Sequence, residues 1–227
     1  MARGYLLSAG RKRGNLTLMS LSPSLLSAFR NATAEVHERL EKVPFSAALF
    51  KNLLPRVSII SLFHCLEIIH AALEHHLKDH SDARVHTLTL GYQSKLGALK
   101  KDLALISEKE HQIIFPAEKD ALVFADEISK QSSHSLGIVG MLYVLEGSQN
   151  GGALLKKIYA KNLGVDADAL IYFGFYGSQT SQVWRTFMER LSAMDLSETE
   201  QDQAVQGAVS AFSWIEKIYL ELYPCEG

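Results

Sequence analysis

The segment that decides the fold is SHSLGIVGMLYVLEGSQNGGALLKKIYAKNL, residues 133–163. Its apolar residues recur with the period of an α-helix, and Gly164, directly after it, is a typical helix terminator. A glycine inside a helix costs about 0.5–1 kcal/mol relative to alanine, so a gain elsewhere must offset each one. The segment nevertheless holds five glycines, at positions 137, 140, 147, 151 and 152. The sequence therefore predicts a helix whose glycines have a specific role.

The rest of the chain is also predicted to be helical. Ser22-Pro23 reads as an N-cap followed by a proline at the first helical position, and the helix that follows is expected to end at Pro44. The spacing of apolar residues predicts further helices over 45–54, 59–77, 87–106, 117–130, 177–193 and 198–222.

The last of these helices opens on Ser197-x-x-Glu200, which has the pattern of a capping box. Residues 169–175 contain a glycine and are short, which favours a loop over a strand. No other segment shows the alternation of a strand, and no break in composition divides the chain. We therefore predict an all-α protein with one helical bundle at 21–227.

Composition narrows the functional classes. Hydrophobic residues make up 47% and charged residues 21% of the chain, and the formal net charge of −2 does not indicate a nucleic-acid partner. No run of about 18 apolar residues is present, so no membrane partner is predicted. Residues 1–20 hold four basic residues and no acidic one, and we interpret them as a disordered basic extension. The two cysteines form no C-x-x-C motif, which favours a reducing, cytoplasmic location.

The pattern Gly147-x-x-x-Gly151-Gly152 has two interpretations. Without side chains at these positions, a planar ligand can approach the helix backbone closely, and the helix can kink there. The alternative is tight packing of this helix against another, or a loop that splits it. The polar residues 148–150 between the glycines favour a ligand site, because a packing seam has less use for them.

His37 is the candidate iron ligand. It lies at the edge of the apolar face of the first helix, and a single neutral imidazole is a standard ligand of haem iron. The alternative is a hydrogen-bonded core histidine. Arg30, two turns before His37, and Arg185 are candidates to pair with carboxylates of a ligand, although each can equally be an exposed helix charge.

A di-iron site is a further possibility. Glu67-x-x-His70 and Glu108-x-x-His111 both have the spacing found in carboxylate-bridged di-iron bundles. The polar surroundings of His111 argue against this interpretation, because they suggest a helix end in solvent.

Taken together, these motifs resemble the heme oxygenase family. Residues 26–41, LSAFRNATAEVHERLE, resemble its first helix with the A-T-x-x-x-H proximal histidine, and residues 143–158, YVLEGSQNGGALLKKI, resemble its glycine-rich distal helix. Residues 176–191, YGSQTSQVWRTFMERL, are similar to the later helix that contributes contacts to the haem propionates. The likeness covers about 22–222.

The resemblance implies a heme-oxygenase-like bundle that holds haem (iron protoporphyrin IX) between the first helix and the glycine helix. It implies that His37 is the proximal ligand and that Gly147, Gly151 and Gly152 bring the distal helix close to the haem and to bound O2. Arg30 falls where the family has a basic residue for a propionate, and Arg185 is a second candidate.

The reaction that the resemblance implies is the oxidation of haem by O2 and electrons to biliverdin, carbon monoxide and ferrous iron. Haem is then both cofactor and substrate. A separate protein, such as a ferredoxin, a flavodoxin or a reductase, is expected to supply the electrons, because the sequence carries no flavin or nucleotide motif.

The sequence departs from the family at one position. Many heme oxygenases carry Gly-Asp-x-x-Gly-Gly here, whereas this chain has Ser148 in place of the aspartate. The Leu-Glu-Gly-Ser start at 145–148 is similar to that of some bacterial members associated with phytochromes. We expect Glu146 to point away from the haem, and Gln149 or Asn150 to organise water in place of the aspartate. A haem carrier or sensor without turnover remains the alternative, since it would share His37 and the glycines.

Overall fold

The computed structural model of the protein describes residues 24–107 and 115–223, and the regular structure in these ranges is helical, with no strand. The all-α prediction is therefore confirmed. The helices are α1 (Leu25–Lys42), α2 (Pro44–Phe50), α3 (Arg56–Asp79), α4 (Ala83–Leu88), α5 (Leu96–Ser107), α6 (Glu118–Lys130), α7 (Gly137–Gly147), α8 (Gly152–Leu163), α9 (Thr180–Ser192) and α10 (Glu198–Leu222). Three short 3-10 helices complete the set, namely η1 (Ser148–Gly151), η2 (Ala167–Ala169) and η3 (Gly177–Gln179).

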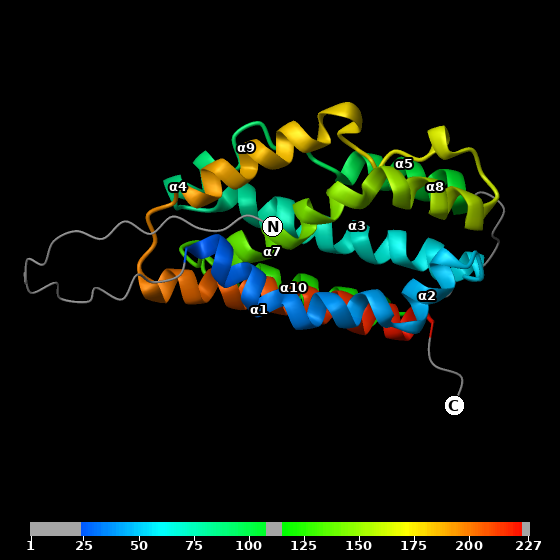
Figure 1. Ribbon diagram of the computed structural model, residues 1–227, viewed down its shortest axis with the longest axis horizontal. Helices are drawn as coiled ribbons and strands as arrows, with labels where there is room; N and C mark the ends of the chain where they lie inside the picture. Colours follow the sequence, from blue (N-terminus) through cyan, green and yellow to red (C-terminus); the bar gives the residue numbers. More distant parts are fainter. Residues whose placement is uncertain (1–23, 108–114, 224–227) are drawn as a thin grey trace, which may run out of the picture.

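The longest helices form the body of the bundle. Helix α10 packs along α7 and α1, while α3 packs against α6 and α5 (Figure 1). Helices α8 and α9 lie above α1 in this view, and α9 also contacts α1 (Figure 1). The cavity described below is lined from both of these sides.

Helix α3 forms much of the core. It is the one helix among the described residues that is long and apolar enough to cross a membrane, but 61% of its most apolar window is buried inside the protein. Packing within the bundle therefore accounts for its apolar composition.

Two glycines set the closest helix contact in the bundle. A Cβ added at Gly140 of α7 would lie 1.8 Å from the carbonyl oxygen of Ala204, and one added at Gly207 of α10 would lie 1.9 Å from that of Gly137. Only glycine allows backbones to approach this closely. The first part of the glycine segment therefore packs tightly against α10.

The prediction of one helix over 87–106 is wrong, because α4 ends at Leu88 and α5 begins only at Leu96. Gly91 has a φ of 76°, which no right-handed helix accommodates. Beyond it, the backbone N–H of Lys95 donates to Glu74 Oε1 at 2.8 Å, which ties the connection to α3. The tertiary contact overrides a weak helical pattern.

Two predicted boundaries also differ. The N-cap of α1 is Ser24, whose Oγ accepts from the N–H of Ser27 at 3.3 Å. The predicted cap at Ser22-Pro23 lies outside the described residues. Pro44 begins α2 at its first position, and α2 ends at Phe50 instead of extending to residue 54. Proline fits the first turn of a helix because that turn needs no N–H donor.

Other local predictions are confirmed. Ser197 and Glu200 form both hydrogen bonds of the capping box at the start of α10. Gly164 ends α8 in the left-handed conformation, with a φ of 67°. Residues 170–175 form a loop after η2, and η3 precedes α9 within the predicted helix 177–193.

Candidate functional site

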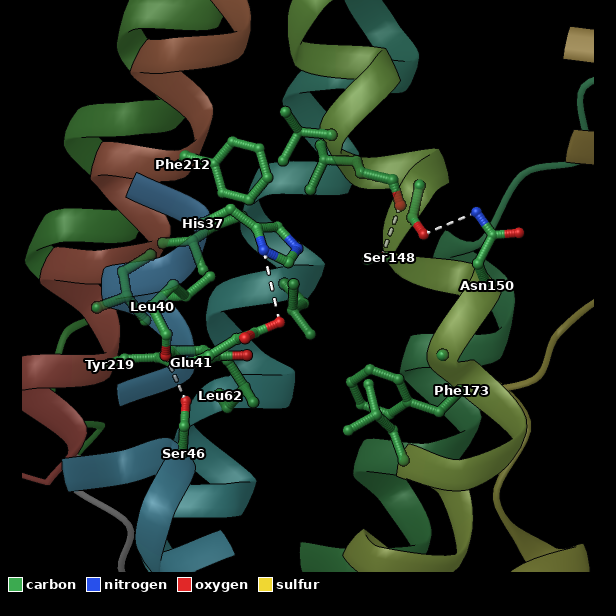
Figure 2. Close-up of a pocket in the computed structure, with 18 of the residues that line it drawn as sticks. His37, Leu40, Glu41, Ser46, Leu62, Ser148, Asn150, Phe173, Phe212 and Tyr219 are labelled. Carbon is green, nitrogen blue, oxygen red and sulfur yellow. Dashed lines mark hydrogen bonds and ion pairs between the residues drawn. The ribbon is translucent and has the colours of Figure 1, made fainter. Parts of the chain in front are cut away.

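A cavity of about 560 Å³ lies between α1 and α10 on one side and α7, η1 and α8 on the other. Figure 2 shows the side chains of His37, Leu40 and Phe212 facing Ser148 and Asn150 across it. The walls are mostly apolar and aromatic, and this volume is in the usual range for small-molecule sites. No lysine or arginine is among the described residues that line the cavity.

His37 stands on the α1 wall of the cavity. Its side chain is 57% exposed and its Nδ1 lies 3.5 Å from Glu41 Oε1, one turn further along the helix. The imidazole also meets the edge of the Phe212 ring, with the centroids 5.5 Å apart. A carboxylate that holds one ring nitrogen while the other faces a cavity is the arrangement expected of a metal-ligating histidine. The alternative of a buried, hydrogen-bonded core histidine does not describe this residue.

The opposite wall is the glycine segment, and its helix is interrupted there. Helix α7 passes into the 3-10 turn η1 at Ser148, and α8 begins at Gly152. Gly147 and Gly151 both line the cavity. A Cβ at Gly151 would come no closer than 3.8 Å to another side chain, and one at Gly147 would approach Trp184 at 3.4 Å. Packing within the protein therefore does not require glycine at position 151 and only weakly restricts position 147.

Gly152 has a different environment. It does not line the cavity, and a Cβ there would lie 2.5 Å from the backbone nitrogen of Gly174. This glycine thus lets the loop of residues 170–179 pack closely on the start of α8. Its assignment to haem binding stays a prediction, whereas its structural role follows directly from this contact.

The three polar residues of η1 differ in their hydrogen bonds. The Ser148 hydroxyl donates to the carbonyl of Leu145 at 2.7 Å, and Asn150 Nδ2 donates to the carbonyl of Gly147 at 3.1 Å. Both residues line the cavity. The side chain of Gln149 is buried, and neither atom of its amide forms a hydrogen bond.

The candidate basic residues lie apart from the cavity lining. Arg30 is on α1 and Arg185 on α9, and both are exposed. Their pairing with carboxylates of a ligand stays a prediction. The described cavity thus supplies an apolar interior, and any charged groups of a ligand would have to reach its rim.

The proposed di-iron set is not assembled in the described residues. Glu108 and His111 lie outside the described ranges, and the described residues contain no group of three His, Cys, Asp or Glu side chains that could hold a metal ion. His70 Nε2 instead forms a hydrogen bond with the Tyr172 hydroxyl at 2.9 Å.

Sequence patterns did not indicate the buried ion pair behind the glycine segment. Lys95 Nζ lies 2.5 Å from Glu146 Oε1, and both side chains are almost fully buried. The Tyr176 hydroxyl donates to Glu146 Oε2 at 2.9 Å and accepts from Lys95 Nζ at 2.8 Å. Glu146 does not line the cavity, so the expectation that it points away is confirmed. The pair ties the end of α7 to the loops at 89–95 and 170–179.

The fold and the cavity define a class of protein: an all-α bundle with one imidazole opposite a kinked, glycine-rich helix. The heme oxygenase family model matches residues 23–221, and the chain belongs to this family. Heme oxygenase 1 from Gallus gallus is 24% identical over 201 residues, which cover 85% of this chain and 68% of that protein. Family membership supports a haem-degrading oxidoreductase.

Solved structures agree on the fold. The heme oxygenase-1 of the cyanobacterium Synechocystis, solved in complex with heme, matches with a TM-score of 0.76 at 18% identity, covering 88% of this chain and 93% of that one. The heme oxygenase of Leptospira interrogans matches with a TM-score of 0.74 at 19% identity, covering 87% and 98%. The bacterial relatives and this chain therefore share one helical architecture.

Proposed function

We propose that the protein is a heme oxygenase that uses O2 and electrons to convert haem to biliverdin, carbon monoxide and ferrous iron. The observation that carries this proposal is that His37 and the two glycines Gly147 and Gly151 line one mostly apolar cavity. The chain provides an imidazole on one wall and, on the other, two positions where the fold itself does not demand glycine.

The residues present fit a haem group. A flat, apolar macrocycle suits aromatic and aliphatic walls, and the empty space beside Gly151 is where a side chain would obstruct it. His37 would ligate the iron, with Glu41 fixing the orientation of its ring. When bound, haem supplies both the iron that reacts with O2 and the carbon that is oxidised.

The chain's own residues would then bind and orient the group and limit access of water. Phe212 packs against the His37 ring from α10, and with the group bound the apolar walls would keep water from its buried side. A separate electron-donor protein would complete the reaction, and a cytoplasmic location fits the free, buried Cys65.

A haem carrier without turnover is the second candidate. Ser148, which stands where many family members have aspartate, directs its hydroxyl to the carbonyl of Leu145, so it has no hydrogen to offer the cavity in this arrangement. Activity separates the two candidates.

The test is a titration of the purified protein with hemin, followed by a reductant under oxygen. A one-to-one Soret complex that decays to a biliverdin spectrum is the expected result. A stable Soret complex that does not decay would favour the carrier, and the absence of a Soret band would contradict both.

Gly151→Val is expected to weaken hemin binding by about tenfold or more while leaving the thermal unfolding midpoint within a few degrees of the wild type. The added side chain enters space that the protein leaves open but the ligand needs. Hemin titration and thermal melting of the unliganded protein measure the two effects.

Gly97→Val is the matched control for this variant. Gly97 lies in α5, and a Cβ there would meet nothing within 4 Å, but the position does not line the cavity. Hemin affinity should stay unchanged in Gly97→Val. Equal binding by the Gly151 variant and the wild type would show that the glycine segment is not a ligand surface.

A further inference from the structure

A tyrosine and a histidine meet at the floor of the cavity. Tyr172 lines the cavity although its side chain is 1% exposed, and its hydroxyl lies 2.9 Å from Nε2 of His70, which is fully buried. Burial raises the pKa of Tyr172 far above its usual range, and the charge of Glu146 adds to this shift. The phenol is therefore neutral, and its hydroxyl faces the residues of η1 on one side and His70 on the other.

The second nitrogen of His70 points towards the edge of the protein. Nδ1 forms no hydrogen bond and lies 3.8 Å from Glu74 Oε1, one turn further along α3. The Glu74 side chain is 14% exposed, and its Oε2 accepts from the hydroxyl of the exposed Ser94 at 2.5 Å. A chain of polar groups thus runs from the cavity through Tyr172, His70 and Glu74 to the surface.

Burial, together with the charge of Lys95, keeps the ring of His70 neutral. Burial, reinforced by the charge of Lys95 from the loop between α4 and α5, lowers the pKa of His70 to about 3. Lys95 is itself paired with Glu146 of α7, and Glu74 is the acidic group that faces the ring from α3. A neutral imidazole has one nitrogen that donates and one that accepts, so it can receive a proton on one side while releasing one on the other.

We propose that Tyr172, His70 and Glu74 form a proton relay from solvent to the cavity. The inference rests on the proposed function, because the reduction of O2 to water consumes protons that an apolar cavity does not supply. The relay would supply protons from residues other than Ser148. Ser148 stands where many family members have an acid, and its hydroxyl donates to the carbonyl of Leu145 in its own helix.

The proton balance is simple. Tyr172 gives its hydroxyl proton to a basic atom in the cavity and takes the proton on Nε2 of His70. The Glu74 carboxylate takes a proton from water and passes it to Nδ1 of His70. No group changes its net charge over the cycle, and the imidazole passes from one tautomer to the other. The relay requires the Glu74 carboxyl group to close the 3.8 Å gap to Nδ1.

The test compares Tyr172→Phe with Tyr176→Phe. Both variants remove one phenol hydroxyl. Tyr176 hydrogen-bonds to Glu146 and Lys95 instead of His70, and it does not line the cavity. Tyr172→Phe should bind hemin with wild-type affinity and slow hemin consumption by about tenfold or more, as loss of an acid–base group does. Its rate should also fall more in D2O than that of the wild type, because proton transfer becomes limiting. Tyr176→Phe should change neither the rate nor the isotope effect by more than about twofold.

A readout without haem accompanies these rates. In the unliganded protein with ¹⁵N-labelled histidine, Tyr172→Phe should shift the Nε2 resonance of His70, and Tyr176→Phe should not. Glu74→Gln preserves the shape of the side chain and should slow consumption in the same direction, which keeps the proposal testable if Tyr172→Phe does not fold.

The outcomes distinguish the two proposals. A wild-type protein that binds hemin and degrades it, together with a Tyr172 variant of equal rate and isotope effect, would overturn the relay alone. A wild-type protein that forms no Soret complex, or never degrades hemin, would overturn the proposed function and the relay with it.

Discussion

His37→Ala is expected to abolish the normal Soret spectrum of the hemin complex and to lower the rate of hemin degradation by more than about 100-fold. Loss of a group that only supports a metal ligand already costs 10- to 100-fold, so loss of the ligand itself should cost more. The free protein should fold as before, because the His37 side chain is 57% exposed and is held by an ion pair with the exposed Glu41 and a ring contact with Phe212. Visible spectroscopy and single-turnover assays measure the loss, and circular dichroism measures the fold.

His75→Ala is the matched control. His75 lies on α3 with Nε2 3.6 Å from Asp79 Oδ2, and its side chain is 76% exposed. It therefore has the same helical spacing to a carboxylate as His37 and similar exposure, but it does not line the cavity. Hemin binding and turnover should be unchanged in His75→Ala. A normal Soret spectrum in His37→Ala would exclude His37 as the iron ligand.

The sequence predicted the helices and both walls of the cavity because the relevant signals are local. Apolar periodicity identified the helices, the Ser197 capping box identified the start of α10, and Gly164 identified the end of α8. His37 and the glycine segment each stood out from their own neighbours along the chain. Their position on opposite walls of one cavity came from the family resemblance, since no local pattern states which helices face each other.

The buried polar contacts could not be predicted in this way. His70 meets Tyr172 and Lys95 meets Glu146 across the bundle, and the members of the first pair are 102 positions apart in the sequence. Such pairs depend on the packing of several helices. The one misplaced helix, 87–106, has the same cause, because the break before α5 places Lys95 beside its buried partner.

Lys95→Met is expected to lower the free energy of unfolding by about 3–5 kcal/mol, because it leaves the Glu146 carboxylate buried without its counter-ion. Burial already lowers the pKa of Lys95, and the charge of Glu146 opposes that shift, so the two groups depend on each other. Urea unfolding followed by circular dichroism measures the loss. The double variant Lys95→Met, Glu146→Leu should recover much of it, since apolar pairs often replace buried ion pairs without a net loss.

The control for this prediction is an ion pair of equal length on the surface. Lys42 Nζ lies 2.5 Å from Glu38 Oε1, as in the buried pair, but the two side chains are 71% and 67% exposed. Water replaces the lost partner there, so Lys42→Met should leave the unfolding midpoint unchanged. If Lys95→Met were as stable as Lys42→Met, the Glu146 carboxyl group would have to be protonated or hydrated in the native protein. The end of α7 would then not depend on this ion pair for its position beside the cavity.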